Sequence, residues 1–206
     1  MVDETSKRQN VKTSKEADED LCRWTMDDGR LDHDQPAIHN RQSPIDNPRL
    51  LAVWRALEAV TDPEIPVISV IEMGIVADVR VEHRRVIVDM TPTFVGCPAL
   101  DVIRENIRAA IHALGEPDVE VNVVFDPPWS SDRITKEGRR KLKDFGLAPP
   151  VHACGASVAA PNLECTPCPY CESTNTNLES IFGPTLCRSI HYCRDCLQSF
   201  EHFKPV

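Results

Sequence analysis

The sequence lacks a long apolar run, an excess of positive charge and a leader typical of exported proteins. No apolar stretch approaches the roughly 18 to 20 residues that a membrane-spanning helix needs, and residues 1–20 are too polar for a signal peptide. Over 206 residues, 32 acidic side chains outnumber 23 Lys and Arg, which gives a net charge of −9. This balance repels phosphate backbones and anionic membrane surfaces. We therefore expect a soluble, cytoplasmic protein that binds neither nucleic acid nor a membrane.

Several motifs of redox and hydrolytic enzymes are also missing. The chain has no Glu-x-x-His pair for a di-iron bundle, no Gly-x-Gly-x-x-Gly turn for a dinucleotide and no plant-type Cys-x4-Cys-x2-Cys cluster motif. Serine, histidine and aspartate residues do not fall at a familiar hydrolase spacing. These absences favour a protein that is not itself an enzyme.

Hydrophobic periodicity predicts a small α+β domain over residues 48–146. Asn47 is a typical N-cap residue, and Pro48 suits the first position of a helix that Asp62-Pro63 would end. The further predicted elements are a β-hairpin of 75–81 and 86–91, a helix of 98–114, a strand of 119–125 and a helix of 132–145. This order indicates helices packed on a short sheet.

Three further segments flank or follow this domain. Residues 1–47 are polar and show neither helix nor strand periodicity, so we expect a disordered arm. Residues 147–164 contain two adjacent prolines and an alanine-rich stretch, which predicts a linker. Residues 165–206 are too few to bury a stable core without a covalent or metal staple.

The cysteines supply a candidate for that staple. Two of the nine cysteines form the knuckle Cys168/Cys171, and two more form the knuckle Cys193/Cys196, with 21 residues between the knuckles. Together they offer the tetrahedral four-sulfur shell that zinc prefers. In a reducing compartment the metal replaces disulfides as the source of folding free energy. We predict a structural zinc ribbon with one zinc ion per chain.

Other residues compete for this metal. Cys165 also forms a Cys-x-x-Cys pair with Cys168, which allows the first knuckle to slip by three residues. Cys187, His191 and His202 are chemically eligible ligands, and iron suits the same four sulfurs. The near-neutral charge of this segment argues against a ribbon that binds nucleic acid.

Cys97 lies at the predicted N-cap of the 98–114 helix. There the helix dipole and free N–H groups would lower the pKa of the thiol and make it a nucleophile or metal ligand. The alternative is a small buried hydrophobe at a cap position. No Cys-x-x-Cys motif includes Cys97, so a thioredoxin-type disulfide cycle is not expected. Asp62, Glu64 and Glu72 lie in loops near the hairpin and either support Cys97 or serve as caps and turn formers.

The 132–145 helix carries an excess of basic side chains. A solvated face is one interpretation, and a dock for an acidic protein is the other. The basic residues are Arg133, Lys136, Arg139, Arg140, Lys141 and Lys143.

Several motifs of the first domain resemble the SufT-type iron–sulfur assembly domain. They are Asp62-Pro63-Glu64, the stretch 69–76, the segment 91–98 with its Gly-Cys-Pro, and the Asp-Pro-Pro-Trp of 126–129. Joined to the cysteine-rich segment 168–206, the whole resembles the PaaD family, the D subunits of bacterial phenylacetyl-CoA epoxidase systems. The resemblance covers residues 48–206 and leaves the arm outside.

This resemblance implies an accessory role in aerobic phenylacetate degradation, as a maturation factor and not as the epoxidase itself. The reactive cysteine of the family corresponds to Cys97, which would transiently bind iron or an iron–sulfur cluster. The four knuckle cysteines correspond to its ribbon ligands, and Cys187 also matches a family position. Partners would be other components of the epoxidase complex, especially its iron–sulfur flavoprotein reductase, with a homodimer as a further expectation. The alternative is a structural component of the oxygenase that transfers no metal.

Overall fold

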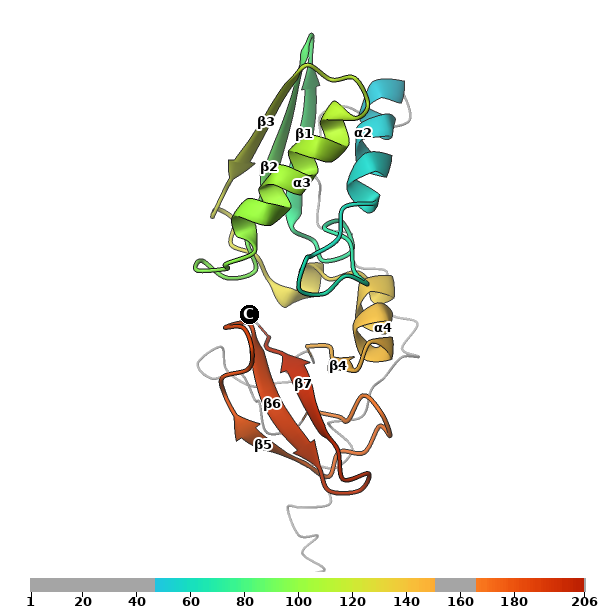
Figure 1. Cartoon of the computed structure of the whole chain (residues 1–206), viewed down its shortest axis with the longest axis vertical. Helices are drawn as coiled ribbons and strands as arrows, with labels where there is room; N and C mark the ends of the chain where they lie inside the picture. Colours follow the sequence, from blue (N-terminus) through green and yellow to red (C-terminus); the bar gives the residue numbers. More distant parts are fainter. Residues whose placement is uncertain (1–46, 151–165, 206) are drawn as a thin grey trace, which may run out of the picture.

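The computed structural model describes residues 47–150 and 166–205, which fold as two units packed against each other (Figure 1). The first unit is α+β, and the second, the ribbon, consists of strands. The first unit has a three-stranded sheet covered by two helices, and the second has a four-stranded sheet. Helix α4 (Lys136–Asp144) lies between the two sheets. Among the described residues, none of the helices has the length and apolar character that a membrane crossing requires.

The first sheet has the strand order β1-β2-β3. Strands β1 (Val76–Glu82) and β2 (Arg85–Met90) form an antiparallel hairpin, which confirms the predicted one. Strand β3 (Asp118–Val123) runs parallel to β2, with Val121 opposite Val88. Parallel neighbours need a crossover connection. Here helix α3 (Leu100–His112) supplies it.

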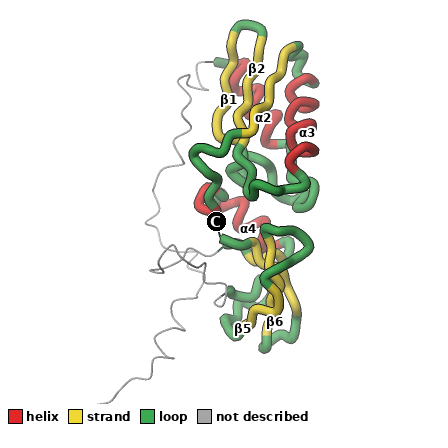
Figure 2. Tube along the Cα trace, turned by 90° about the vertical axis from the view of Figure 1, so that its left-hand side faces the viewer, coloured by secondary structure: helices red, strands yellow, loops and turns green. Residues whose placement is uncertain are grey.

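Helices α2 (Pro48–Glu58) and α3 cover one face of this sheet (Figure 2). The side chain of Asn47 caps α2 by accepting hydrogen bonds from the backbone N–H groups of Arg49 and Leu50, both at 3.1 Å. Helix α3 buries one apolar stripe of three isoleucines spaced four residues apart, namely Ile103, Ile107 and Ile111. These contacts follow the predicted cap and the predicted periodicity.

Two helices begin later than the sequence indicates. Helix α3 starts at Leu100, because Pro98 and Ala99 belong to a preceding turn. The predicted 132–145 helix divides into a short 3-10 turn (Ser131–Arg133) and α4. Thr135 causes this division, since its side chain accepts a hydrogen bond from Gly138 N–H at 3.0 Å and caps α4.

The second sheet has the order β4-β7-β6-β5. Strands β5 (Thr176–Ser180), β6 (Arg188–Cys193) and β7 (Ser199–Phe203) are antiparallel, and β4 (Leu147–Ala148) joins β7 in parallel.

The predicted linker 147–164 begins too early, because its first two residues form strand β4. Its two residues pair with the ribbon, and the two prolines that follow are buried. A strand of two residues is too short for a periodic pattern to reveal it. Residues 151–164 of that linker, and the predicted arm before Asn47, lie outside the described residues.

The two units share one hydrophobic core. Trp129, only 4% exposed, donates from Nε1 to the carbonyl of Met73 at 3.1 Å, and its ring lies 5.9 Å from that of Phe203. From the ribbon, Arg188 donates to the carbonyl of Glu64 at 3.1 Å and pairs with Glu201 at 2.7 Å. The ribbon is therefore docked on the first unit by buried apolar and polar contacts.

Candidate functional site

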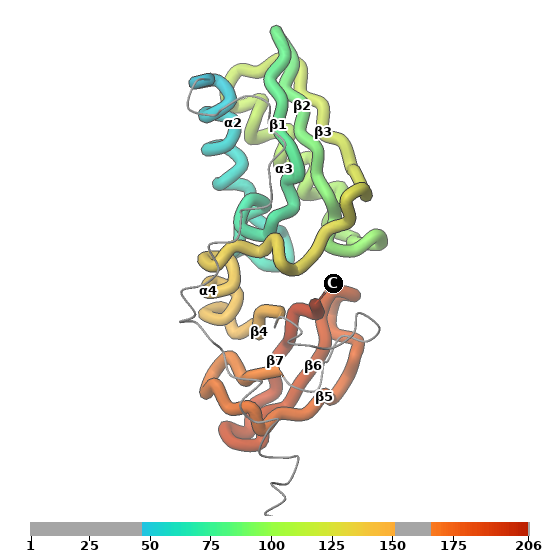
Figure 3. The backbone as a smooth tube through the Cα atoms, turned by 180° about the vertical axis from the view of Figure 1, so that it is seen from behind, coloured from blue at the N-terminus to red at the C-terminus, as the bar shows by residue number. Residues whose placement is uncertain are grey.

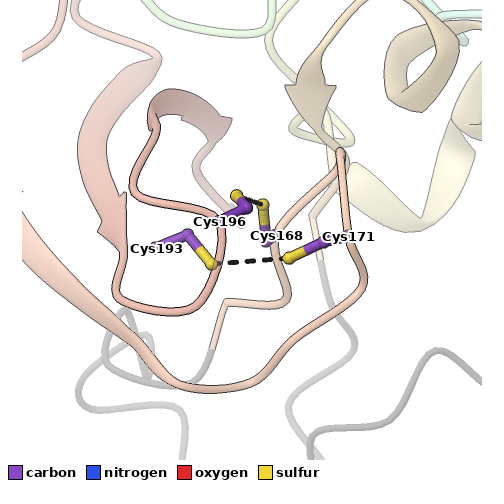
Figure 4. Close-up of side chains that lie close together, drawn as sticks. All are labelled: Cys168, Cys171, Cys193 and Cys196. Carbon is purple, nitrogen blue, oxygen red and sulfur yellow. Dashed lines mark hydrogen bonds between the residues drawn. The ribbon is translucent and has the colours of Figure 1, made fainter.

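Four cysteines of the ribbon turn their sulfur atoms toward one another (Figure 4). The Sγ atoms of Cys168, Cys171, Cys193 and Cys196 all lie within 4.8 Å of one another. The distance from Cys168 to Cys196 is 3.6 Å and that from Cys171 to Cys193 is 3.5 Å. A tetrahedral zinc ion bound at about 2.3 Å separates its sulfurs by about 3.8 Å. The donor set and its spacing therefore fit a four-thiolate metal site.

Both knuckles use the same turn. The residue after the second cysteine is left-handed in each, with φ of 62° at Glu172 and 60° at Leu197. Burial raises the pKa of Cys193, but the backbone N–H groups of Cys196 and Asp195 outweigh it and bring the pKa to about 7. In contrast, burial and the neighbouring thiols raise the pKa of Cys196 to about 12, and burial raises that of Cys168. In the metal-free ribbon the thiolate, which is the form that binds a metal ion, is therefore favoured at Cys193.

The left-handed residue of the second knuckle offers a stability test. Leu197 is 69% exposed, so replacing it by glycine removes little packing while relieving its backbone strain. We expect Leu197→Gly to raise the free energy of unfolding by about 0.5–1 kcal/mol, measured by denaturant titration of the metal-loaded protein. Gln198→Gly is the control, because Gln198 lacks a positive φ and should lose stability. A loss of stability in Leu197→Gly would contradict this account of the turn.

The competing histidines do not join the four cysteines. His191 and His202 are fully buried, and their rings contact edge to face at 5.2 Å. The hydroxyl of Ser189 lies 3.0 Å from His191 Nε2 and 3.5 Å from His202 Nδ1. Burial lowers the pKa of His191 to about 4 and that of His202 to about 3, so both rings are neutral at pH 7. Cys165 lies outside the described residues.

Cys97 lies in the loop between β2 and α3 and is half-buried against the core of the first unit. It precedes the first residue of α3 by three positions, so it is not the N-cap of that helix. Burial raises the pKa of its thiol, the backbone N–H of Ala99 offsets this only in part, and the charge of Asp62 raises the pKa further. The predicted lowering of the pKa is therefore wrong for the metal-free protein.

Two of the three predicted acids lie near Cys97. Asp62 is buried and accepts hydrogen bonds from the backbone N–H groups of Glu64 at 2.7 Å and Ile65 at 3.1 Å. This turn holds both acids close enough for their charges to raise the pKa of Cys97. The thiol therefore lies in an electronegative environment, which favours a bound cation.

Glu72 has a different set of partners. Its carboxylate accepts a hydrogen bond from Ser69 N–H at 2.9 Å and pairs with Lys141 Nζ at 2.6 Å. Burial raises its pKa, but Lys141 and Ser69 together outweigh burial and bring the pKa below its ordinary value. Glu72 thus joins the loop before β1 to helix α4, and this geometry favours a structural role over support of Cys97.

The Glu72 contacts predict a pH-dependent loss of stability in Glu72→Gln. A carboxylate with a lowered pKa stabilises the folded state above its unfolded pKa and loses that contribution as the pH falls through the folded pKa. We expect the variant to lose about 1 kcal/mol at pH 7, and the difference to disappear as the pH falls through the lowered pKa of Glu72. Denaturant titrations at several pH values measure it. Glu137→Gln is the control, because its pair with Arg140 is fully exposed and should leave stability unchanged. A pH-independent difference would contradict the ion pair.

The basic side chains of the predicted 132–145 helix are largely engaged within the chain. Arg139 is mostly buried and donates to the carbonyls of Ser131 at 2.6 Å and Pro150 at 2.5 Å. Arg133 donates a hydrogen bond to the carbonyl of Val76. The ion pairs of this segment are those of Arg140 with Glu137 and Asp144, of Lys141 with Glu72, and of Lys143 with Glu172. Arg133 moreover precedes α4. The structure therefore favours a structural interpretation of this helix over a dock for an acidic protein.

Cys187 belongs to the ribbon and packs against the hydrophobic core that the two units share. Its Sγ lies 3.1 Å from Thr185 Oγ1, and the next residue, Arg188, binds the carbonyl of Glu64. Burial raises the pKa of Cys187, Thr185 and Arg188 lower it, and Glu64 raises it. The thiol that the sequence left without a role thus lies at the contact between the units, within electrostatic reach of Cys97.

Comparisons with known proteins agree with this two-part arrangement. A family described as iron-sulfur cluster assembly protein matches residues 51–123, and the PaaD zinc beta ribbon domain matches residues 157–204. A relative from Escherichia coli (strain K12), named as the D subunit of a putative 1,2-phenylacetyl-CoA epoxidase, is 34% identical over 167 residues, which cover 81% of this chain and 99% of the relative. This chain belongs to the PaaD family.

Other relatives of this PaaD-family chain match a smaller part of it. The Fe-S protein maturation auxiliary factor SufT of Staphylococcus aureus (strain USA300) is 37% identical over 85 residues, 40% of this chain and 96% of that protein. A crystal structure of a domain of unknown function, DUF59, from Bacillus anthracis is 32% identical and covers 44% of this chain and 87% of its own, with a TM-score of 0.41. The resemblance to SufT-type and PaaD domains is confirmed.

Proposed function

We propose that this protein is an iron–sulfur maturation factor of a phenylacetyl-CoA epoxidase system, in which Cys97 transiently binds iron or a cluster. One observation carries the proposal: the thiol of Cys97 is half-buried, and the negative charges of Asp62 and Glu64 act on it. Burial raises the pKa of the thiol most, the negative charges of Asp62 and Glu64 raise it further, and a bound cation relieves this repulsion. Thiolate and carboxylate oxygen are both ligands that iron accepts.

The loop that carries Cys97 suits contact with another protein. Phe94, Val95 and Gly96 are exposed, and Val95 is 77% exposed. Exposed apolar side chains beside a functional group are typical of interaction sites. A maturation factor needs such access, because its cargo has to pass to a recipient.

The four ribbon cysteines serve a different purpose in this proposal. They would hold one zinc ion per chain, and all four of its coordination positions would be filled by protein sulfur. Such a closed site stabilises a fold and leaves no position for transfer. The cargo site at Cys97 and the structural site of the ribbon are therefore separate.

The recipient we propose is the iron–sulfur flavoprotein reductase of the epoxidase system, in the cytoplasm. The relative named as the D subunit of a phenylacetyl-CoA epoxidase supports an accessory place in such a system. The relative named as an Fe-S protein maturation auxiliary factor supports cluster maturation as the task. A homodimer would bring two copies of Cys97 to one cluster, which needs several protein ligands.

Anaerobic reconstitution with iron and sulfide tests the proposal. We expect the wild type to form a labile chromophore and to activate the cluster-free reductase, and Cys97→Ser to lose both. Cys22→Ser is the matched control, because it removes a thiol outside both described units. Normal reductase activation by Cys97→Ser would overturn the proposal. If that variant also co-purifies with the oxygenase at fixed stoichiometry, the protein is a structural component instead.

A further inference from the structure

We propose that a groove between the two units binds an arginine side chain that a segment of a partner protein presents. The groove has a volume of about 500 Å³, within the range of roughly 300–1,000 Å³ that is typical of binding pockets. Its lining comes from Glu64 of the first unit, from the end of α4 and from strands β6 and β7 of the ribbon. This inference does not depend on the proposed function, because it involves neither Cys97 nor a bound cluster.

One face of the ribbon sheet forms the base of the groove. Glu201 of β7 is paired with Leu147 of β4 on one side and with Ile190 of β6 on the other. Residues paired across neighbouring strands point to the same face of a sheet, so these three side chains lie in one row. Helix α4 leads directly into β4, beside β7, in both opposite views (Figures 1 and 3). The base thus offers apolar surface on both sides of one carboxylate.

Two exposed aromatic side chains also line the groove. Phe145, the C-cap residue of α4, is 48% exposed, and Tyr170 of the first knuckle is 52% exposed. Tyr170 packs closely on Gly146, because a Cβ at Gly146 would lie 2.9 Å from the Tyr170 hydroxyl oxygen and 3.2 Å from a ring carbon. Aromatic faces bind the planar guanidinium group of arginine by stacking and by cation–π attraction. The two rings therefore favour arginine over a compact cation.

The charges of the groove favour a cation as well. Two acidic side chains and one basic side chain line it, and the basic one, Arg188, is already paired with Glu201 at 2.7 Å. Arg188 also donates to the backbone carbonyl of Glu64 at 3.1 Å, which holds Glu64 at the groove without using its carboxylate. Within residues 47–150 and 166–205, that carboxylate has neither a hydrogen bond nor an ion pair. A guanidinium group satisfies such a carboxylate with two parallel hydrogen bonds.

The size and the apolar base of the groove indicate an arginine that is carried by a protein segment. One side chain fills only part of this volume, and apolar neighbours of the arginine can cover Leu147 and Ile190. Arginine and aromatic residues are the side chains that most often dominate protein–protein contacts. The net charge of −9 also attracts a basic segment over a longer range.

An NMR titration of the zinc-loaded, full-length protein tests the proposal. The probe is the tripeptide N-acetyl-Leu-Arg-Leu-amide, and the comparison peptide carries citrulline, which is uncharged but nearly isosteric, in place of arginine. We expect saturable shifts of the backbone amide signals of Glu64, Phe145 and Ile190 with the arginine peptide. The citrulline peptide should bind about tenfold more weakly, because it lacks the charged hydrogen bonds.

Two variants locate the binding. Glu64→Gln removes the carboxylate but keeps the backbone carbonyl that Arg188 binds, and we expect it to weaken binding of the arginine peptide about tenfold. Phe145→Leu keeps an apolar side chain but removes the aromatic face, and we expect a loss of about threefold. The matched controls, Glu58→Gln and Phe125→Leu, change exposed residues that do not line the groove and should bind like the wild type.

Several results would overturn the proposal. Equal affinity for the arginine and citrulline peptides, or unchanged binding in either groove variant, would refute a cation site. If arginine amide alone binds as tightly as the tripeptide, the groove takes a small guanidinium compound and not a protein segment. Self-association that Phe145→Leu abolishes in sedimentation experiments would place a second copy of the chain in the groove. Since none of these measurements involves Cys97 or the reductase, failure of the maturation role is seen separately.

Discussion

Removal of the metal from the four ribbon cysteines is expected to unfold the second sheet. The separate buried cluster of the ribbon consists of Ala148, Cys168, Cys193 and Phe200, so half of its members are metal ligands. Without the metal, little apolar burial offsets the conformational entropy of this segment. Structural zinc sites in zinc-finger peptides supply about 10–16 kcal/mol at pH 7, which is comparable to the whole free energy of unfolding of a typical domain.

Hydrogen exchange with mass spectrometry measures this effect by segment. We expect a chelator, or Cys193→Ser, to remove protection from β5, β6 and β7 while β1, β2 and β3 stay protected, because the first sheet has its own buried core. Cys22→Ser, with an intact ribbon site, is the control. A chelated protein that retains protection across β6 would show that the metal is not the main source of stability there.

Gly74→Ala is expected to destabilise the first unit more than a substitution at any glycine with free space around it. Gly74 has a φ of +68°, and a Cβ there would lie 2.5 Å from the carbonyl oxygen and 2.6 Å from the Cβ of Arg133. The left-handed backbone costs a non-glycine residue about 1–2 kcal/mol, and overpacking adds about 1–3 kcal/mol. Because the contact is with backbone, side-chain rotation does not relieve it.

Gly115→Ala separates these two contributions. Gly115 has a φ of +87°, but no atom lies within 4 Å of the position that a Cβ would take there, so only the backbone cost applies. We expect Gly115→Ala to lose about 1–2 kcal/mol and Gly74→Ala to lose clearly more in denaturant titrations of the zinc-loaded protein. Equal losses would mean that the segment around Arg133 moves away freely. Trp129 donates to the carbonyl of Met73, the residue before Gly74, and its ring contacts that of Phe203 in the second unit. We therefore also expect Gly74→Ala to weaken the contact between the units.

The elements that sequence reasoning predicted well depend on neighbours in the chain. The Asn47 cap and the β1-β2 hairpin follow from hydrogen bonds and side-chain alternation over a few residues. The two knuckles are encoded in the same local way, since Cys-x-x-Cys sets the distance between two sulfurs by one turn. Short-range patterns of this kind leave little for distant residues to change.

Sequence reasoning was less informative where the partners of a side chain are far away in sequence. The adjacent helix predicts a low pKa for Cys97, but burial and Asp62 raise it. For the basic side chains of α4 the sequence left two interpretations open, a solvated face and a dock, and it did not indicate that Glu72 and Glu172 pair with Lys141 and Lys143. A single element does not show which charges the rest of the fold brings to it.

The sequence alone determined the four sulfurs of the ribbon, the α+β character of the first unit and the family to which the chain is similar. Only the tertiary structure decided that the ribbon docks on that unit through Trp129 and Phe203, a contact that no sequence pattern indicates. That docking also ties Arg188 of the ribbon to the carbonyl of Glu64 in the first unit, at 3.1 Å. The physical reason is the range of the interactions. Ligand spacing within a knuckle is a local property of the chain, whereas the contacts of Trp129 with Phe203 and of Arg188 with Glu64 depend on the packing of two whole units.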